Sequence, residues 1–239
     1  MNILITGSKG FIGKNLIRYL KANSNHNIFE FSREDLFEDL EQIINKIDIL
    51  FHFAGLNKKT VNENFDKVNT NFTNKLCKIL EKNIKTKIYY ASSTQAEKDN
   101  DYGRSKLECE EIMIELKNSN KNEIAILRLP GIFGMGCKPN YNSVVATFCF
   151  NTINNISLNI IGPNKEIEIV FIEDLCKQLA FLIENNSYQN IYVKIENINK
   201  VNIEYLAKKI KNFKYISSPS VIKNDLEKKL YKTFLSYKT

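Results

Sequence analysis

The sequence predicts an α/β fold, in which helices cover both faces of a parallel sheet, from three observations. Strand-like and helix-like segments alternate through the first half of the 239-residue chain. A glycine-rich turn, Gly7 to Gly13, follows the first strand-like segment and opens a helix-like one. Polar motifs recur where later strands end, and open parallel sheets bind their ligands beyond those ends.

Apolar runs predict five strands in the first half, over residues 2–5, 27–31, 47–53, 87–91 and 123–129. Amphipathic segments between them predict helices over 11–22, 36–45, 64–82 and 102–118. After Pro130 the pattern predicts a strand at 167–171 and helices at 144–153, 172–184, 202–212 and 223–233. We expect a nucleotide-binding domain over 1–155 and a small substrate-binding lobe over 156–239.

Composition argues against several classes of function. The net charge is +7, but only four of the 34 basic residues are arginine and the lysines are spread along helices, so we expect no nucleic-acid partner. No apolar run is long enough to predict a membrane span, and no signal peptide is visible, so we expect a cytoplasmic protein. Two histidines and five widely spaced cysteines predict no metal site.

The turn Thr6-Gly7-Ser8-Lys9-Gly10-Phe11-Ile12-Gly13 predicts a Rossmann-type dinucleotide site. Gly7 would allow the tight turn, Gly10 the approach of backbone to a pyrophosphate, and Gly13 the packing of helix on strand. The first N–H groups of the helix lack intrahelical partners and suit a diphosphate. The candidate cofactor residues here are Gly7, Ser8, Lys9, Gly10, Phe11, Ile12 and Gly13.

The end of the second strand predicts which nucleotide is used. An enzyme selective for NAD usually places an acid there, to bind the ribose 2′-hydroxyl. This chain has Ser32 and Arg33, which would suit a 2′-phosphate, and Lys9 would add a second cation. We therefore expect NADPH in preference to NADH. Glu30 is the residue that would reverse this prediction if the strand were shifted by two positions.

Three residues are candidates for catalysis. Tyr102 and Lys106 are four apart at the start of a predicted helix, and so lie on one face. A tyrosine of ordinary pKa near 10 is a poor acid–base group at neutral pH, but a nearby cation favours its phenolate. Ser93, at the end of the fourth strand, could donate a hydrogen bond to the same substrate oxygen.

These residues, in this order, resemble the extended short-chain dehydrogenase/reductase family. The matching motifs are the glycine turn, His52-Phe53-Ala54-Gly55, Asn69, Ser92-Ser93, Tyr102-Gly103-Arg104-Ser105-Lys106 and Arg128-Leu129-Pro130. The resemblance implies that Ser93, Tyr102 and Lys106 are catalytic and that Lys106 also holds the nicotinamide ribose. It implies further cofactor contacts from Phe53, Ala54, Gly55, Asn69 and Tyr102. A homodimer through the helices at 64–82 and 102–118 is also implied.

The second half is similar to the reductase–cupin enzymes of capsular-polysaccharide biosynthesis, which make a UDP-linked N-acetyl-L-fucosamine precursor. The similarity lies in residues 137–149 and 230–237. It implies NADPH-dependent reduction of a UDP-4-keto-6-deoxy-N-acetylhexosamine by a reductase half alone, with a separate cupin-type epimerase as an expected partner. The residues expected at the UDP-sugar are Ser93, Thr94, Arg128, Lys138, Asn140, Tyr141, Asn142 and Ser143.

Two departures from the family pattern limit the function. Gly131 replaces the asparagine of Arg-x-x-Asn, and Ser93-Thr94-Gln95 lacks the acids of the sugar-nucleotide dehydratases, which disfavours dehydration. Two other functions stay open. One is a sugar-nucleotide epimerase that retains NAD(H), and the other is a non-catalytic NAD(P)-binding sensor or partner protein. The intact Ser-Tyr-Lys set argues against the second of these.

Overall fold

The computed structural model describes residues 1–58, 65–83, 85–120, 122–185 and 190–238. Its contacts divide the chain into two compact units, each made of two chain segments. Unit 1 is Met1–Leu129 with Cys176–Ile195, and unit 2 is Pro130–Leu175 with Glu196–Thr239. The boundary expected after residue 155 therefore falls inside unit 2, and the later part of the chain returns to complete unit 1.

Unit 1 contains a five-stranded parallel sheet. Its strands are β1 (Asn2–Thr6), β2 (Asn27–Phe31), β3 (Ile49–His52), β4 (Lys87–Ser93) and β5 (Ile124–Leu129). They lie in the order β2-β1-β3-β4-β5, and all four pairings are parallel. The predicted doubly wound α/β class is confirmed. The strand order reverses beside β1, which is where sheets of this kind bind their ligands.

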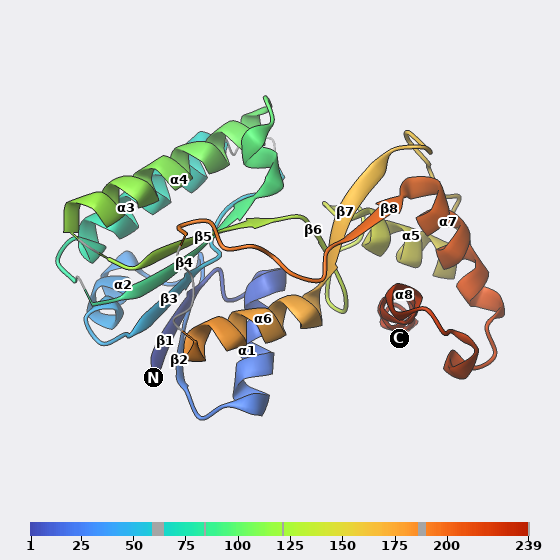
Figure 1. Cartoon of the computed structure of the whole chain (residues 1–239), viewed down its shortest axis with the longest axis horizontal. Helices are drawn as coiled ribbons and strands as arrows, with labels where there is room; N and C mark the ends of the chain where they lie inside the picture. The colour runs from blue at the N-terminus through green and yellow to red at the C-terminus, as the bar shows by residue number, and fades with distance from the viewer. Residues whose placement is uncertain (59–64, 84, 121, 186–189, 239) are drawn as a thin grey trace. The chain divides into compact units, whose positions relative to one another are not determined.

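Helices cover both faces of this sheet (Figure 1). They are α1 (Phe11–Asn23), α2 (Phe37–Ile44), α3 (Asn71–Leu80), α4 (Asp101–Asn120) and the part of α6 (Ile172–Glu184) from Cys176 onward. On the face of α2, α3 and α4, strand residues such as Leu4, Leu50 and Ile88 join one apolar core. On the face of α6, the Tyr89 hydroxyl donates to the Leu182 carbonyl at 2.6 Å. Burial on both faces explains why the strands read as nearly continuous apolar runs.

A short returning segment covers the outer edge of β5, which sequence analysis did not predict. The Ile126 N–H donates to the Ile191 carbonyl at 2.7 Å, and the Val193 N–H donates to the Ile126 carbonyl at 3.0 Å. These bonds satisfy backbone groups that an open edge would expose. They also bring Tyr192, which lies between the two bonded residues, beside Ile126 of β5.

Unit 2 is smaller and mixed. It contains β6 (Gly131–Phe133), α5 (Val144–Ile153), β7 (Glu166–Phe171), β8 (Asn199–Asn202), α7 (Ile203–Asn212) and α8 (Asp225–Leu235). β6 pairs with β7 in parallel, and β8 pairs with β7 antiparallel. The helices and β7 lie where the sequence predicted them. β6 and β8 were missed because a strand of three or four residues is too short for an alternation pattern to show.

Two kinds of feature are absent from the described ranges. None of the helices there is long and apolar enough to cross a membrane. Within those same ranges, no three His, Cys, Asp or Glu side chains gather as metal ligands would. The five cysteines carry free thiols, and Cys137 alone among them is partly exposed.

Candidate active site

The glycine turn lies at the carboxyl end of β1, against the end of β3. Gly7 has a φ of +70°, which residues with a side chain rarely adopt. A Cβ at Gly7 would lie 2.8 Å from the Ala54 nitrogen, and one at Gly13 would lie 2.4 Å from the Gly7 carbonyl oxygen. A side chain at either position would clash with this backbone. Gly7 and Gly13 therefore allow the tight turn and the close packing of helix on strand that the dinucleotide-binding motif requires.

The helix that follows presents a positive end to this cradle. Gly10 caps α1 without a side-chain hydrogen bond, and the first turn of α1 contains no acidic residue. The Ser8 N–H donates to the Phe31 carbonyl at 3.1 Å, which ties the turn to β2. An anion at the start of α1 would thus meet N–H groups without competition from a carboxylate of that first turn.

The turn after β2 contains two acids that sequence analysis did not consider. Asp35 accepts from the Ser32 N–H at 2.6 Å and from the Ser32 hydroxyl at 2.9 Å, and these bonds lower the pKa of Asp35. Lys9 forms an ion pair with Glu34, and the hydrogen bond in that pair raises the pKa of Lys9. The turn therefore mixes cations and carboxylates.

Glu30 does not lie at the position where an acid would bind the ribose 2′-hydroxyl of NAD. β2 ends at Phe31, so Ser32 and Arg33 are the first residues beyond it, as the NADPH prediction requires. Glu30 lies one residue before that end, is exposed, and pairs with Lys21 at 2.8 Å. The choice between NADPH and NADH depends on the turn at 32–35 and stays a prediction.

The end of β3 is held by a buried hydrogen-bonded histidine. His52 Nδ1 lies 2.8 Å from the Thr6 hydroxyl, and its Nε2 lies 3.2 Å from the Thr73 hydroxyl. Burial, aided by the Lys106 cation, lowers the pKa of His52 to about 3. The Phe53 and Ala54 N–H groups donate to the Thr6 carbonyl and hydroxyl respectively. His52 is therefore a neutral support for the predicted cofactor residues of this strand end.

Asn69 lies in a π-helical turn, Asp66–Thr70, that precedes α3. The helix expected over 64–82 is thus two elements, and its first residue, 64, lies outside the described residues. The Asn69 amide accepts from the Leu56 N–H at 2.6 Å and donates to the Leu56 carbonyl and the Ser105 hydroxyl. It joins the loop after β3 to α4. Direct contact of Asn69 with a cofactor stays a prediction.

Lys106 and Tyr102 project from the first turns of α4. The Lys106 ammonium donates to the Ala91 carbonyl at 2.5 Å, and burial lowers the pKa of Lys106 to about 8. The Tyr102 ring is partly buried and tilted against Phe65, with 5.4 Å between ring centroids. Asn100 caps the helix by accepting from the Gly103 N–H at 2.9 Å. This cap fixes the residue at which the helix begins, and so fixes the position of Tyr102 in its first turn.

Ser93 ends β4 and caps a short 3-10 helix, η2 (Thr94–Glu97). Its hydroxyl oxygen accepts from the Gln95 N–H at 3.1 Å, so the hydroxyl hydrogen can still be donated. Gly103 brings α4 against this turn. A Cβ at Gly103 would lie 2.2 Å from the Gln95 carbonyl oxygen and 2.5 Å from that of Lys98. Ser93, Tyr102 and Lys106 thus occupy adjoining elements of unit 1.

The residues expected at the sugar nucleotide are divided between the units. Arg128, in unit 1, is the last residue but one of β5 and pairs with the buried carboxylate of Glu110. The others after β5 are Lys138, Asn140, Tyr141, Asn142 and Ser143, and all of them belong to unit 2. There Ser143 caps α5, and the Lys138 ammonium lies 5.5 Å from the Tyr141 ring centroid. Their substrate contacts stay predictions.

The sequence matches the model of the NAD dependent epimerase/dehydratase family over residues 3–193. The chain belongs to this family. A member from Pseudomonas aeruginosa, UDP-2-acetamido-2,6-beta-L-arabino-hexul-4-ose reductase, is 32% identical over 241 residues, covering 99% of this chain and 65% of its own. The chain therefore spans slightly less than two thirds of that relative.

Solved structures agree with this family assignment. The capsular polysaccharide assembling protein CapF from Staphylococcus aureus is 35% identical with a TM-score of 0.85, covering 99% of this chain and 66% of its own. UDP-glucuronic acid 4-epimerase from Bacillus cereus, solved with NAD, has a TM-score of 0.86 at 18% identity, and covers 100% of this chain and 99% of its own. At that identity the second likeness shows the fold alone.

Four residues around the candidate site were given no role from the sequence, although Gly103 was part of a matching motif. They are Asp35, Gly103, Glu110 and Tyr192. Glu110 carried a usable signal, because it follows Lys106 by four residues and so lies on the same face of α4. Tyr192 carried none, since only the fold brings residue 192 to β5.

Proposed function

We propose that the chain reduces the 4-keto group of a UDP-4-keto-6-deoxy-N-acetylhexosamine with NADPH, in the branch of capsule or O-antigen biosynthesis that leads to UDP-N-acetyl-L-fucosamine. The observation that carries this proposal is the set of Ser93, Tyr102 and Lys106 on adjoining elements, at the same edge of the parallel sheet as the glycine turn. The 32% identical relative is named as a hexul-4-ose reductase, which supports the choice of substrate.

The chain's residues fit the cofactor as follows. The turn from Gly7 to Gly13 and the start of α1 would hold the diphosphate, and the ends of β2 and β3 would hold the adenosine half. Lys106 would hold the nicotinamide ribose with donors that remain beside its bond to the Ala91 carbonyl. When bound, NADPH supplies the hydride that reduces the keto carbon.

The protein's part in the reaction is proton transfer and charge stabilisation. Tyr102 donates its phenolic proton to the substrate oxygen as negative charge develops there, and the proton is later replaced from solvent. Ser93 donates a hydrogen bond to the same oxygen. The Lys106 cation favours the phenolate that remains. The bonds that place Ser93 and Lys106, to the Gln95 N–H and the Ala91 carbonyl, pre-organise this set.

Charged side chains in and beside the turn after β2 bear on the choice between NADPH and NADH. Arg33 and Lys9 supply the charge that a 2′-phosphate needs. Asp35 engages both Ser32 donors and Glu34 engages Lys9, so a bound 2′-phosphate would have to compete with two carboxylates. We expect NADPH to be preferred by a modest ratio rather than exclusively.

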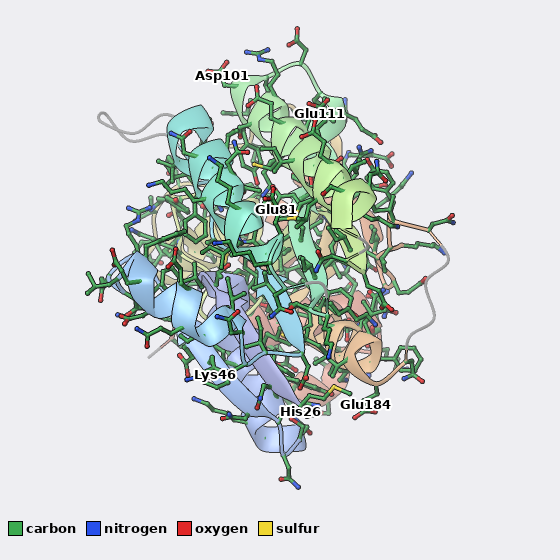
Figure 2. The ribbon with its side chains drawn as sticks, turned by 90° about the vertical axis from the view of Figure 1, so that its left-hand side faces the viewer. His26, Lys46, Glu81, Asp101, Glu111 and Glu184 are labelled. Atoms are coloured by element: carbon green, nitrogen blue, oxygen red, sulfur yellow. The ribbon has the colours of Figure 1, made fainter. Side chains whose placement is uncertain are left out.

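The proposed assembly is a homodimer through α3 and α4, with a separate cupin-type epimerase acting on the same pathway. The two helices lie side by side (Figure 2), with Glu111 on α4 and Glu81 just beyond α3. Leu107 is 38% exposed on α4, which supports an apolar contact at this face. Its neighbours Glu108 and Glu111 are exposed and would form the polar rim.

The proposed activity is tested by loss of absorbance at 340 nm with NADPH or NADH and a panel of UDP-4-keto-6-deoxy sugars. Tyr102→Phe should lower kcat by about 100-fold or more, because it removes the proton donor, while NADPH binding changes little. Tyr215→Phe, at an 81% exposed tyrosine of unit 2, is the control.

Retention of wild-type kcat by Tyr102→Phe would refute the role of Tyr102. Failure of the wild-type chain to oxidise either nucleotide with any sugar of the panel would refute the reductase function. If a tightly held NAD(H) copurified with such an inactive chain, the epimerase alternative would gain support instead.

A further inference from the structure

A fully buried carboxylate lies one helical turn beyond Lys106. Glu110 has no exposed surface, and with Tyr102 and Lys106 it forms a stripe of residues four apart along α4. A buried carboxylate is costly unless several donors and an opposite charge satisfy it. Glu110 has both, and its partners come from three other segments of unit 1.

The principal partner is Arg128 at the end of β5. Arg128 Nε donates to Glu110 Oε1 at 3.0 Å, and Nη2 donates to Oε2 at 2.7 Å, so the pair is bidentate. The remaining terminal nitrogen, Nη1, pairs with Glu97, the last residue of η2. One guanidinium therefore connects α4 with the turn that begins immediately after Ser93.

Two hydroxyl groups complete the cluster. The Ser92 hydroxyl donates to Glu110 Oε1, and Ser92 lies opposite Arg128 in the pairing of β4 with β5. The Tyr192 hydroxyl donates to Glu110 Oε2 at 3.1 Å, and its ring lies 4.5 Å from the guanidinium carbon. The bonds from Ser92, Arg128 and Tyr192 all end on the Glu110 carboxylate, so they tie the helix of Lys106 to the strand of Ser93.

We propose that Glu110 and Arg128 are positioning residues, which hold Ser93 at the correct distance from Tyr102 and Lys106, and that Arg128 does not contact the substrate. The inference rests on the proposed reductase function. It adds to that function by saying what holds the reacting groups in place. A displacement of about 1 Å between reacting groups can lower a rate by about 100-fold. The bidentate pair and its two hydroxyl donors are what prevent such an error.

The cluster also acts on Lys106 through its charge. The Glu110 carboxylate raises the pKa of Lys106 against the larger lowering that burial causes. Among the described residues, the other titratable groups facing Lys106 are Tyr102 and Cys109 on α4, Tyr90 on β4 and His52 on β3. Arg128 neutralises much of the Glu110 charge. Removing Glu110 should therefore lower the pKa of Lys106, and removing Arg128 should raise it.

The test uses three cluster variants: Glu110→Gln, Arg128→Gln and the two changes combined. The control is Glu111→Gln, at an exposed neighbour on the same helix (Figure 2). Each single cluster variant should lower kcat by about 10- to 100-fold, with KM for the UDP-sugar within about threefold of wild type. The alkaline limb of the kcat profile should move to lower pH in Glu110→Gln, since Lys106 loses its proton sooner. It should move to higher pH in Arg128→Gln and return towards the wild-type position in the double variant.

A purely structural role would lower activity without these opposite shifts, and that result would overturn the proposal. Arg128→Lys keeps a cation beside Glu110 and so avoids an unpaired buried charge if the glutamine variants do not fold. Arg128→Lys should lower kcat but leave KM and the alkaline limb of the kcat–pH profile unchanged. A raised KM with normal kcat would instead make Arg128 a substrate contact.

The proposal can fail independently of the reductase function. Titration of the 13Cε resonance of Lys106 in labelled protein needs no substrate. It should show the same opposite pKa shifts in the two single variants even if no sugar of the panel is reduced. Unshifted titrations in both variants would refute the electrostatic part of the proposal.

Discussion

His52 has no exposed surface, and its ring nitrogens are bonded to the hydroxyls of Thr6 and Thr73, so its imidazole stays neutral near pH 7. Because burial lowers the pKa of His52 to about 3, the unfolded chain binds a proton at a higher pH than the folded chain does. The stability from this residue is complete above its unfolded pKa, near 6.5. It is lost as the pH falls towards 3.

The lowered pKa of His52 predicts how the stability of the protein depends on pH. Between pH 7 and pH 4 the free energy of unfolding should fall by on the order of 3 kcal/mol from His52 alone. His52→Gln should be less stable at pH 7 but lose less stability on acidification, as measured by urea unfolding at each pH. His26→Gln, at the other histidine, is the control. Parallel curves for wild type and His52→Gln would contradict the assignment.

Gly103 acts at the level of elements, because it lets the first turn of α4 pack against η2. A Cβ there would lie 2.2 Å and 2.5 Å from two backbone carbonyl oxygens, and backbone cannot rotate away as a side chain can. Gly103→Ala should therefore separate the two elements that carry Ser93 and Tyr102. We expect a loss of about 1–3 kcal/mol of stability and a loss of kcat larger than that of cofactor binding.

Arg104→Ala is the matched control for Gly103→Ala. Arg104 is the next residue on α4, and its ion pairs with Asp99 and Asp101 are exposed, so its loss should cost less than about 1 kcal/mol. Thermal unfolding and single-turnover rates would separate the two variants. A Gly103→Ala chain with the stability and kcat of Arg104→Ala would show that the close packing is not needed.

At the scale of the whole molecule, unit 1 depends on residues 176–195, far from its other segment in sequence. That segment brings the buried side chains of Leu179, Leu182 and Ile183 to the sheet face, and the 191–193 strand segment to the edge of β5. Burial of such side chains contributes about 1.5–3 kcal/mol each, and whole domains are stable by only about 5–15 kcal/mol.

A fragment of residues 1–155 should consequently fail to fold, although the sequence pattern ends its nucleotide-binding half there. Circular dichroism and denaturant unfolding should show no cooperative transition for the fragment, beside a clear one for the full chain. A co-expressed fragment of residues 156–239 should restore the transition if it supplies the missing layer. Cooperative unfolding of 1–155 alone, at the midpoint of the full chain, would contradict the interleaved arrangement.

The sequence by itself determined the family and the longer elements, because both depend on local patterns, whereas the short strands β6 and β8 were missed. α5 and the five strands of unit 1 form where apolar periodicity predicted them, and the glycine turn has the positive φ at Gly7 that its motif required. Ser93, Tyr102 and Lys106 could be named as candidates from a strand end and a helix-face spacing, which follow from the periods of 2 and 3.6, while their catalytic roles came from the family resemblance and stay predictions.

Only the tertiary structure decided what surrounds those residues. Asp35 meets Ser32 within the turn after β2, whereas Glu34 meets Lys9 of the glycine turn, 25 positions earlier, and no local pattern distinguishes these two acids from solvated ones. The pairing of Glu110 with Arg128 and Tyr192 joins residues up to 82 positions apart. Such contacts depend on how strands and helices pack, and packing is set by the whole chain rather than by any segment of it.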